Sequence, residues 1–141
     1  MYQLVYLSST VELLSEEELR ALLEQSRKSN MELGVTGMLL YHDGNIIQVL
    51  EGEKLKVMNL YSKIERDDRH RGIIRLISGE ISQRDFPNWS MGFKSLSSAQ
   101  YKQLLGYFDP ASHKALNAPD AAEDRAALSL LKSFTASNNI Y

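Results

Sequence analysis

Four polar side chains occupy positions that the hydrophobic pattern assigns to buried faces. Ser26 and Asn30 continue the apolar stripe of a predicted helix at i+4 spacing, which keeps both on one helix face. Gln48 lies in the apolar run of a predicted strand, and Tyr6 lies on the inward side of another. Leaving amide donors and acceptors unpaired in an apolar interior costs roughly 1–3 kcal/mol. Together, the four groups predict a pocket for a flat polar ligand between a sheet and its helices.

Each of these residues also has a purely structural explanation. Tyr6 can be a packing residue with a hydrated hydroxyl, and Ser26 can bond to a carbonyl of its own helix. Asn30 precedes Gly34 closely enough to be a helix C-cap. Gln48 can make an ordinary side-chain-to-backbone hydrogen bond. Taken one at a time, the residues do not decide between these explanations and a ligand site.

The elements that position these side chains are predicted from hydrophobic periodicity, turn residues and caps. Strands are expected at residues 2–8, 35–42, 45–51, 72–82 and 89–96. Helices are expected at residues 15–29, 54–71, 97–108 and 120–134. The order βαββαββ, followed by two more helices, predicts an α+β fold, a ferredoxin-like sandwich with two additional C-terminal helices. Those last helices are expected to cover the second sheet face, a partner, or both.

Local signals support several of these elements. Ser15 with Glu18 has the form of a capping box, and Asp43-Gly44 is a strong hairpin signal. The second helix is expected to bury a stripe made of Leu55, Met58, Tyr61 and Ile64. The last helix is expected to bury Leu128, Leu131 and Phe134.

The amino-acid composition limits the kinds of binding and catalysis to be expected. The 141 residues carry 16 basic and 18 acidic side chains, a balance that gives no indication of nucleic-acid or membrane binding. No transmembrane run or signal peptide is apparent, so a cytoplasmic location is expected. The absence of cysteine excludes disulfides, thiolate nucleophiles and thiolate metal sites. His42 and His113 lack partners at ligand spacing, so no metal site is predicted.

Tyr6, Asn30 and Gln48, followed by Trp89 and Met91, resemble the BLUF family in residue type and spacing. Members of this family are blue-light sensors that use flavin adenine dinucleotide (FAD). The resemblance runs from residue 1 to about 97 and includes the stretches QLVYLSS, GVTGMLLYHDGNIIQVLEGE, DDRHRG and FPNWSMGF.

The resemblance implies where the flavin lies and which residues change on illumination. The ring is expected between the two sandwich helices, with Ser26 and Asn30 among the residues that bind it. Gln48 would bridge between the Tyr6 hydroxyl and the flavin edge. Tyr6 would give an electron and a proton to the excited flavin, and the Gln48 amide would then rotate or change tautomer. The missing cysteine fits this non-covalent mechanism, because sensors of the LOV type need a thiol for their flavin adduct.

By the same resemblance, Trp89 and Met91 would relay the signal along the last strand. The structural alternatives are that Trp89 is only an aromatic residue of the core and that Met91 only fills a gap in the packing. His70 would lie near the ring, and Arg69 or Arg71 would meet the ribityl-diphosphate tail, since a guanidinium suits phosphate oxygens. The alternative for this charged cluster is a solvated helix end.

The resemblance implies a light sensor rather than an enzyme, with residues 1–97 as the sensor domain and 98–141 as a helical extension for output or oligomerisation. A downstream signalling protein in trans and a homo-oligomer are the expected partners. One alternative is a small hydrolase of the acylphosphatase type, but the loop SSTVELLSEE lacks the phosphate-binding arginine that this enzyme needs. The other is a flavin-free regulatory domain that binds a different ligand.

Overall fold

The computed structural model describes residues 1–93, 107–108 and 126–137. The elements, in chain order, are β1 (Tyr2–Thr10), α1 (Glu16–Leu33), β2 (Thr36–His42), β3 (Asn45–Gly52), α2 (Lys54–Glu65), β4 (His70–Glu80), β5 (Trp89–Phe93), β6 (Tyr107–Phe108) and α5 (Ala126–Ser137). None of the helices within these ranges is both long and apolar enough to cross a membrane.

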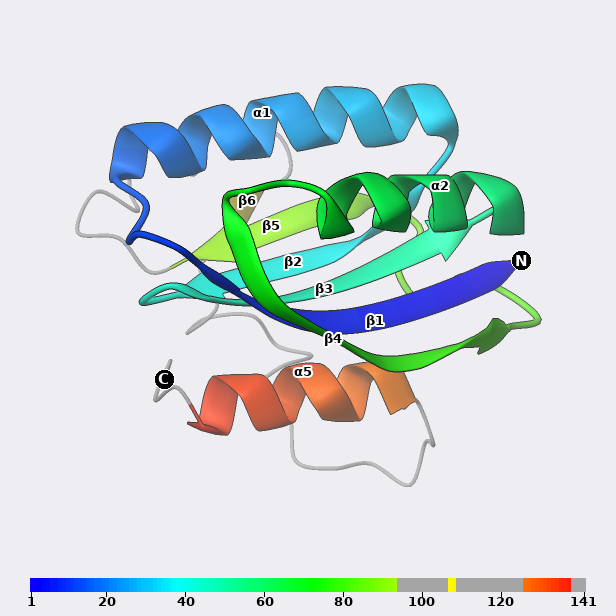
Figure 1. Ribbon diagram of the computed structural model, residues 1–141. Coiled ribbons are helices and arrows are strands. Elements are labelled where there is room, and N and C mark those ends of the chain that lie inside the picture. The colour runs from blue at the N-terminus through cyan, green and yellow to red at the C-terminus, as the bar shows by residue number, and fades with distance from the viewer. Residues whose placement is uncertain (94–106, 109–125, 138–141) are drawn as a thin grey trace.

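All six strands form one sheet in the order β4-β1-β3-β2-β5-β6. β1 lies between β3 and β4 and is antiparallel to both, whereas β5 runs parallel to β2. Helices α1 and α2 cover one face of this sheet, and α5 lies on the other (Figure 1). The predicted α+β, ferredoxin-like fold is confirmed.

Local sequence signals account for α1. The Ser15 hydroxyl accepts from the backbone of Glu18, and the Glu18 carboxylate accepts from the backbone of Ser15, so the predicted capping box is present. Gly34 caps the C-terminal end with φ 68°, a left-handed conformation that glycine adopts without steric cost. Asn30 lies inside the helix and is buried, so the C-cap explanation for Asn30 is wrong.

The hairpin between β2 and β3 also follows its sequence signal. Asp43 and Gly44 have φ values of 46° and 86°, and His42 pairs with Asn45 across the turn. Two consecutive positive φ angles match the right-handed twist of the flanking strands, which is why Asp-Gly is favoured there. The hairpin sets the register that places Gln48 opposite Leu39.

The sheet face opposite α1 and α2 is covered by α5. Ala127, Leu131 and Phe134 are buried there against strand residues such as Val5 and Val49. The predicted burial of Leu131 and Phe134 is confirmed, while Leu128 is half-buried at the edge of this cluster. The first described residue of this helix is Ala126, and positions 120–125 of the predicted helix lie outside the described residues.

The second helix and its stripe differ from the prediction. Helix α2 ends at Glu65 rather than near Arg71, because residues from His70 onward pair with β1 as strand β4. Leu55 is 68% exposed, so its predicted burial is wrong. It lies two residues from the fully buried Val57, and residues two apart point to different sides of a helix.

The helix predicted at 97–108 is wrong at its end, since Tyr107 and Phe108 form β6 and pair with β5. Residues 97–106 lie outside the described residues. A two-residue strand held by long-range pairing leaves no periodic signal in the sequence.

Candidate functional site

A cavity of about 210 Å³ lies between α1, α2 and the sheet face that they cover. Its lining brings together six of the residues predicted from the sequence, namely Tyr6, Ser26, Asn30, Gln48, Arg69 and His70. The other lining residues are Leu22, Gln25, Ser29, Leu39, Leu60, Lys63, Ile64 and Asp67. Apolar side chains with a few convergent polar groups are the usual composition of a cofactor site.

Tyr6 and Gln48 form the floor of this cavity. They are directly opposite each other in the β1–β3 pairing, and the Tyr6 hydroxyl donates a hydrogen bond to the Gln48 side-chain oxygen. Both side chains are buried. Burial raises the pKa of the Tyr6 phenol, and the nearby Tyr61 and Asp67 raise it further, so the phenol keeps its proton at neutral pH.

The bond to Tyr6 also orients the Gln48 amide. Because its oxygen is committed to the phenol, a ligand in the cavity would meet the amide through its NH₂ group.

Asn30 supplies the observation that points most directly to a ligand. Its side chain is 3% exposed, and its Nδ2 atom is buried with no hydrogen-bond partner among the described residues. An unpaired buried donor costs roughly 1–3 kcal/mol, which an acceptor on a bound ligand would offset. Ser26 lies one turn earlier on α1 and is half-buried in the same wall.

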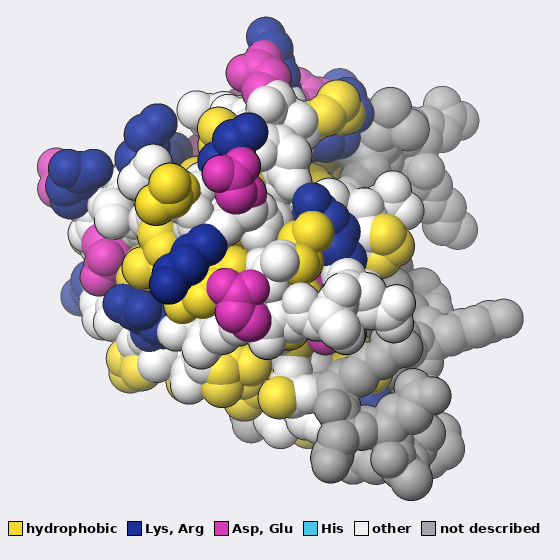
Figure 2. Space-filling model, turned by 90° about the vertical axis from the view of Figure 1, so that its right-hand side faces the viewer, with side chains coloured by type: hydrophobic (Ala, Val, Ile, Leu, Met, Phe, Trp, Pro, Cys, Tyr) yellow, Lys and Arg dark blue, Asp and Glu magenta, His cyan; other side chains and the backbone are white. Residues whose placement is uncertain are grey.

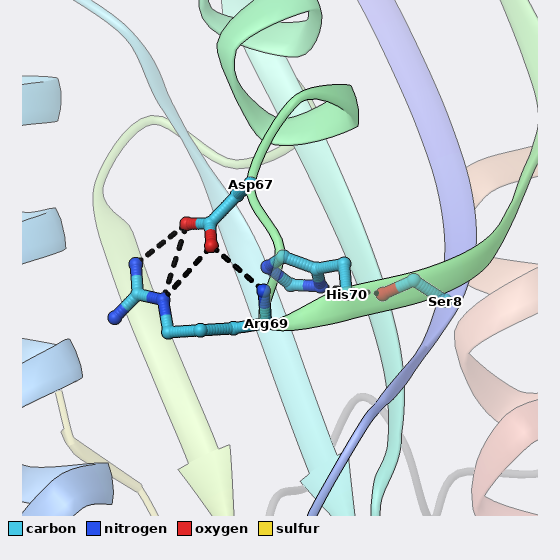
Figure 3. A network of polar contacts seen from close by, with 4 residues as sticks. All are labelled: Ser8, Asp67, Arg69 and His70. Atoms are coloured by element: carbon cyan, nitrogen blue, oxygen red, sulfur yellow. Dashed lines mark hydrogen bonds and ion pairs between the residues drawn. The ribbon is translucent and has the colours of Figure 1, made fainter.

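Charged side chains form the rim between α2 and β4 (Figure 3). Arg69 Nη2 lies 2.6 Å from Asp67 Oδ2, and this hydrogen-bonded pair holds the pKa of the Asp67 carboxyl down at about 2. The same contact raises the pKa of Arg69. The Arg69 side chain is 63% exposed, so the pair contributes little to stability.

His70 lies beside this pair, with its ring directed toward Ser8 (Figure 3). The Ser8 hydroxyl is 3.0 Å from His70 Nδ1. Burial lowers the pKa of His70, which favours the neutral imidazole at neutral pH.

Three of the predicted residues do not line the cavity. Arg71 is exposed on β4, where it pairs with Ser9. Trp89 is buried beneath α1 in a cluster that includes Leu39. The backbone of Met91 pairs with Leu39 of β2, and its side chain lies outside the described part of the chain.

The cavity lining also includes Gln25, Ser29 and Lys63, which were not predicted from the sequence. Gln25 and Ser29 follow Leu22 at three- and four-residue steps, so the helical spacing that identified Ser26 could also have found them. Polar side chains are ordinary on a helix, however, and only the position of α2 shows that they face a cavity. In the described ranges, no group of three or more metal-binding side chains occurs.

Comparison with known proteins identifies the family of the chain. Residues 1–92 match the BLUF family, described as sensors of blue-light using FAD. The chain belongs to the BLUF family. FAD is therefore its cofactor, and blue-light sensing is the function of the matched region.

Among BLUF relatives, the photoactivated adenylate cyclase subunit beta of Euglena longa is 34% identical over 108 residues. The match covers 76% of this chain and 12% of that protein, so the chain spans about an eighth of its curated relative. A bacterial light-regulated adenylyl cyclase matches with a TM-score of 0.63 and 34% identity, over 99% of this chain and 35% of that one. The photo-activated state of BlsA has a TM-score of 0.63 and 27% identity, and covers 94% of this chain and 92% of that chain.

Proposed function

We propose that the chain detects blue light through FAD bound non-covalently in the cavity between α1, α2 and the sheet, and that Tyr6 and Gln48 are the residues that respond. The bond between them carries the proposal, because it joins a buried protonated phenol to an amide at the cavity wall. The unpartnered Asn30 amide on the facing wall supports a ligand with hydrogen-bond acceptors, and oxidised flavin is such a ligand.

The lining residues fit a flavin. Ser26, Asn30 and the Gln48 amide suit the polar edge of the ring, while leucine and isoleucine side chains from both helices and β2 suit its faces. At the rim we assign His70 to the ring and Arg69 to the diphosphate tail. Arg69 is preferred to Arg71 for this role because Arg69 lines the cavity and Arg71 does not.

FAD held in this cavity would supply, on excitation by blue light, an oxidant for a nearby phenol. Tyr6 is placed to give that oxidant an electron and to release its phenolic proton along the hydrogen bond to Gln48 Oε1, and both would return to Tyr6 when the charges recombine. Gln48 can rotate or change tautomer because the two ends of its amide are nearly the same size. Donor and acceptor then exchange places at the cavity wall without a covalent bond being formed.

Leu39 offers a path from Gln48 to the outgoing strand. It lies opposite Gln48 in β3 and opposite Met91 in β5, and it packs in the same cluster as Trp89. We therefore keep Trp89 and Met91 as the relay, with output through residues 98–141 to a partner protein or a second copy of the chain. A changed side-chain arrangement at Leu39 can shift the balance between two conformations of β5.

Visible absorption spectroscopy tests this function. The purified protein, reconstituted with FAD if necessary, should be yellow, and blue illumination should move its flavin bands reversibly to longer wavelength. A colourless protein that does not bind added FAD would rule out the proposal. A yellow protein whose spectrum is unchanged by light would rule out the Tyr6 and Gln48 mechanism.

A further inference from the structure

Two arginines line a second cavity, at the C-terminal end of α1. Arg27 comes from α1, and Arg84 comes from the loop between β4 and β5. This cavity measures about 500 Å³ and shares no lining residue with the flavin cavity. The end of the molecule at which α1 terminates faces the viewer in Figure 2, where basic, acidic and hydrophobic side chains are interspersed.

Among the described residues, the Arg84 guanidinium donates only to uncharged oxygens. It donates to Thr36 Oγ1 at 2.6 Å, to the Glu51 carbonyl at 2.8 Å and to the Gly34 carbonyl at 2.9 Å. A guanidinium has five N–H donors, so these three bonds leave donor capacity. Because these partners carry no charge, they fix the position of the guanidinium without forming an ion pair.

Arg27 adds a second cation to the same wall. Among the described residues, no carboxylate lies within ion-pair distance of Arg27 or Arg84. Both side chains are half-buried, where charges are screened less than on the open surface. The pair therefore places two cationic groups, neither in an ion pair with a described residue, in the lining of one cavity.

Trp89 provides an independent observation at this cavity. The residue is 8% exposed and lines the cavity, and its indole Nε1 is buried with no hydrogen-bond partner among the described residues. An indole N–H can only donate, so it needs an acceptor. A ligand rich in acceptor oxygens suits the two guanidinium groups, and the indole ring of Trp89 lies beside them in the lining.

We propose that this cavity binds a small organic phosphate of mononucleotide size. Phosphate oxygens accept paired hydrogen bonds from guanidinium groups, and a dianion matches two positive charges. The volume lies within the roughly 300–1,000 Å³ of known small-molecule sites. Val35, Pro87 and the Trp89 ring give the remainder of the ligand an apolar wall.

Binding at this cavity would be linked to light sensing, because Trp89 lines the cavity and is also the first residue of β5, the strand proposed to relay the light signal. A ligand that binds one conformation of β5 more tightly shifts the equilibrium between the conformations that light also shifts. Light then changes the affinity for this ligand by the same factor by which the ligand changes that equilibrium. This link depends on the proposed function, whereas binding in the dark does not. A failed light effect with intact dark binding would therefore count against the relay and not against the site.

Isothermal titration calorimetry of the FAD-loaded protein in the dark tests the site. The probes are adenosine monophosphate, ribose 5-phosphate and, as the ligand without phosphate, adenosine. Saturable binding is expected for the two phosphates and not for adenosine. The chain has one tryptophan, so quenching or enhancement of its fluorescence by the phosphates locates binding at Trp89. The flavin absorption must be unchanged, which excludes displacement of FAD.

Arginine variants make the result decisive. Arg27→Gln is expected to weaken phosphate binding about tenfold or more, because it removes a charge-assisted hydrogen bond to the phosphate. Arg20→Gln is the matched control, because Arg20 is on the same helix but pairs with Glu24 away from the cavity. Arg84→Gln is a second variant that should also weaken phosphate binding. Its affinity is compared with that of the wild type only if the two proteins unfold at the same temperature. Absence of binding by both phosphates at about 5 mM, or equal affinity in Arg27→Gln and wild type, would overturn the proposal.

Discussion

The Tyr6 hydroxyl donates to the Gln48 oxygen across two neighbouring strands, and this bond is the smallest unit of the proposed switch. Its position follows from the strand register, which places the two residues directly opposite each other on the face covered by α1 and α2. Both residues were predicted from the sequence, because each has a polar side chain on a strand face that the hydrophobic pattern assigns to the interior. The bond between them could not be predicted from the residues alone, because register depends on pairing 42 residues apart.

Tyr6→Phe should retain FAD and abolish the light-induced shift, because the ring still packs but the transferable proton is gone. Light-minus-dark absorption spectra measure the effect. Tyr41→Phe is the control, since the Tyr41 hydroxyl is also bonded, to the Leu14 backbone N–H, but does not line the flavin cavity. A full shift in Tyr6→Phe would show that the proton comes from elsewhere.

Asn30→Ala should weaken FAD binding about fivefold to tenfold, as expected for one lost hydrogen bond of roughly 1–1.4 kcal/mol. Fluorescence titration with FAD gives the dissociation constant. Asn59→Ala changes an exposed asparagine on α2 outside the cavity lining and should bind as the wild type does. Unchanged affinity in Asn30→Ala would remove Asn30 from the flavin site.

Stability should decrease below pH 6.5 because of His70. Its folded-state pKa is lowered by burial, so the unfolded chain takes up the proton first and stability is lost as pH falls through the folded value. Asp67 does not contribute over this range, since its pKa of about 2 keeps it ionised.

The measurement is urea unfolding at pH 7.5 and pH 5.5 for the wild type and the His70→Gln variant. His70→Gln should reduce the difference in unfolding free energy between the two pH values. An equal pH effect in His70→Gln and wild type would contradict the assignment.

At the level of elements, the loop before β5 is attached to the sheet by the buried Glu51 carboxylate. This carboxylate accepts hydrogen bonds from Gln3 Nε2 at 2.9 Å, the Asp85 backbone N–H at 2.9 Å and the Phe86 backbone N–H at 2.7 Å. The three contacts connect β1, β3 and the loop that leads into Trp89. Their long separation in sequence explains why no local pattern indicated them.

Glu51→Ala should lower the free energy of unfolding by roughly 3 kcal/mol, because it leaves several partly buried donors without an acceptor. Chemical denaturation of the FAD-loaded protein measures the change. Glu53→Ala is the matched control, since Glu53 is exposed and its side chain makes no capping bond to α2. Equal losses in the two variants would contradict a structural role for the Glu51 contacts.

Local signals and long-range pairing explain which elements the sequence could predict. α1 and the β2–β3 hairpin are specified by short motifs, the capping box and Asp43-Gly44, and both were predicted. The end of α2 is different, because the charged residues up to Arg71 can continue a helix in isolation. In the folded chain, the pairing of His70 with Thr10 extends β4 through this region instead.

At the scale of the whole molecule, one sheet separates α5 from the helices α1 and α2, which cover the proposed flavin cavity (Figure 1). In β3, Gln48 lines the cavity and the next residue, Val49, packs in the cluster under α5. The same strand therefore contributes side chains to both faces of the sheet. The alternation of side chains in the sequence predicted two differently covered faces. It could not indicate that Trp89 would line a second cavity, because this depends on how the 81–88 loop folds over the end of α1.

The central claim is that rearrangement of the Gln48 amide produces the light signal, and the light-minus-dark spectrum of Gln48→Leu tests it most directly. This variant should bind FAD with an ordinary dark spectrum and show no shift under blue light. Gln25→Leu, which changes a glutamine of the same cavity on α1, should keep the shift. An intact reversible shift in Gln48→Leu would contradict the account.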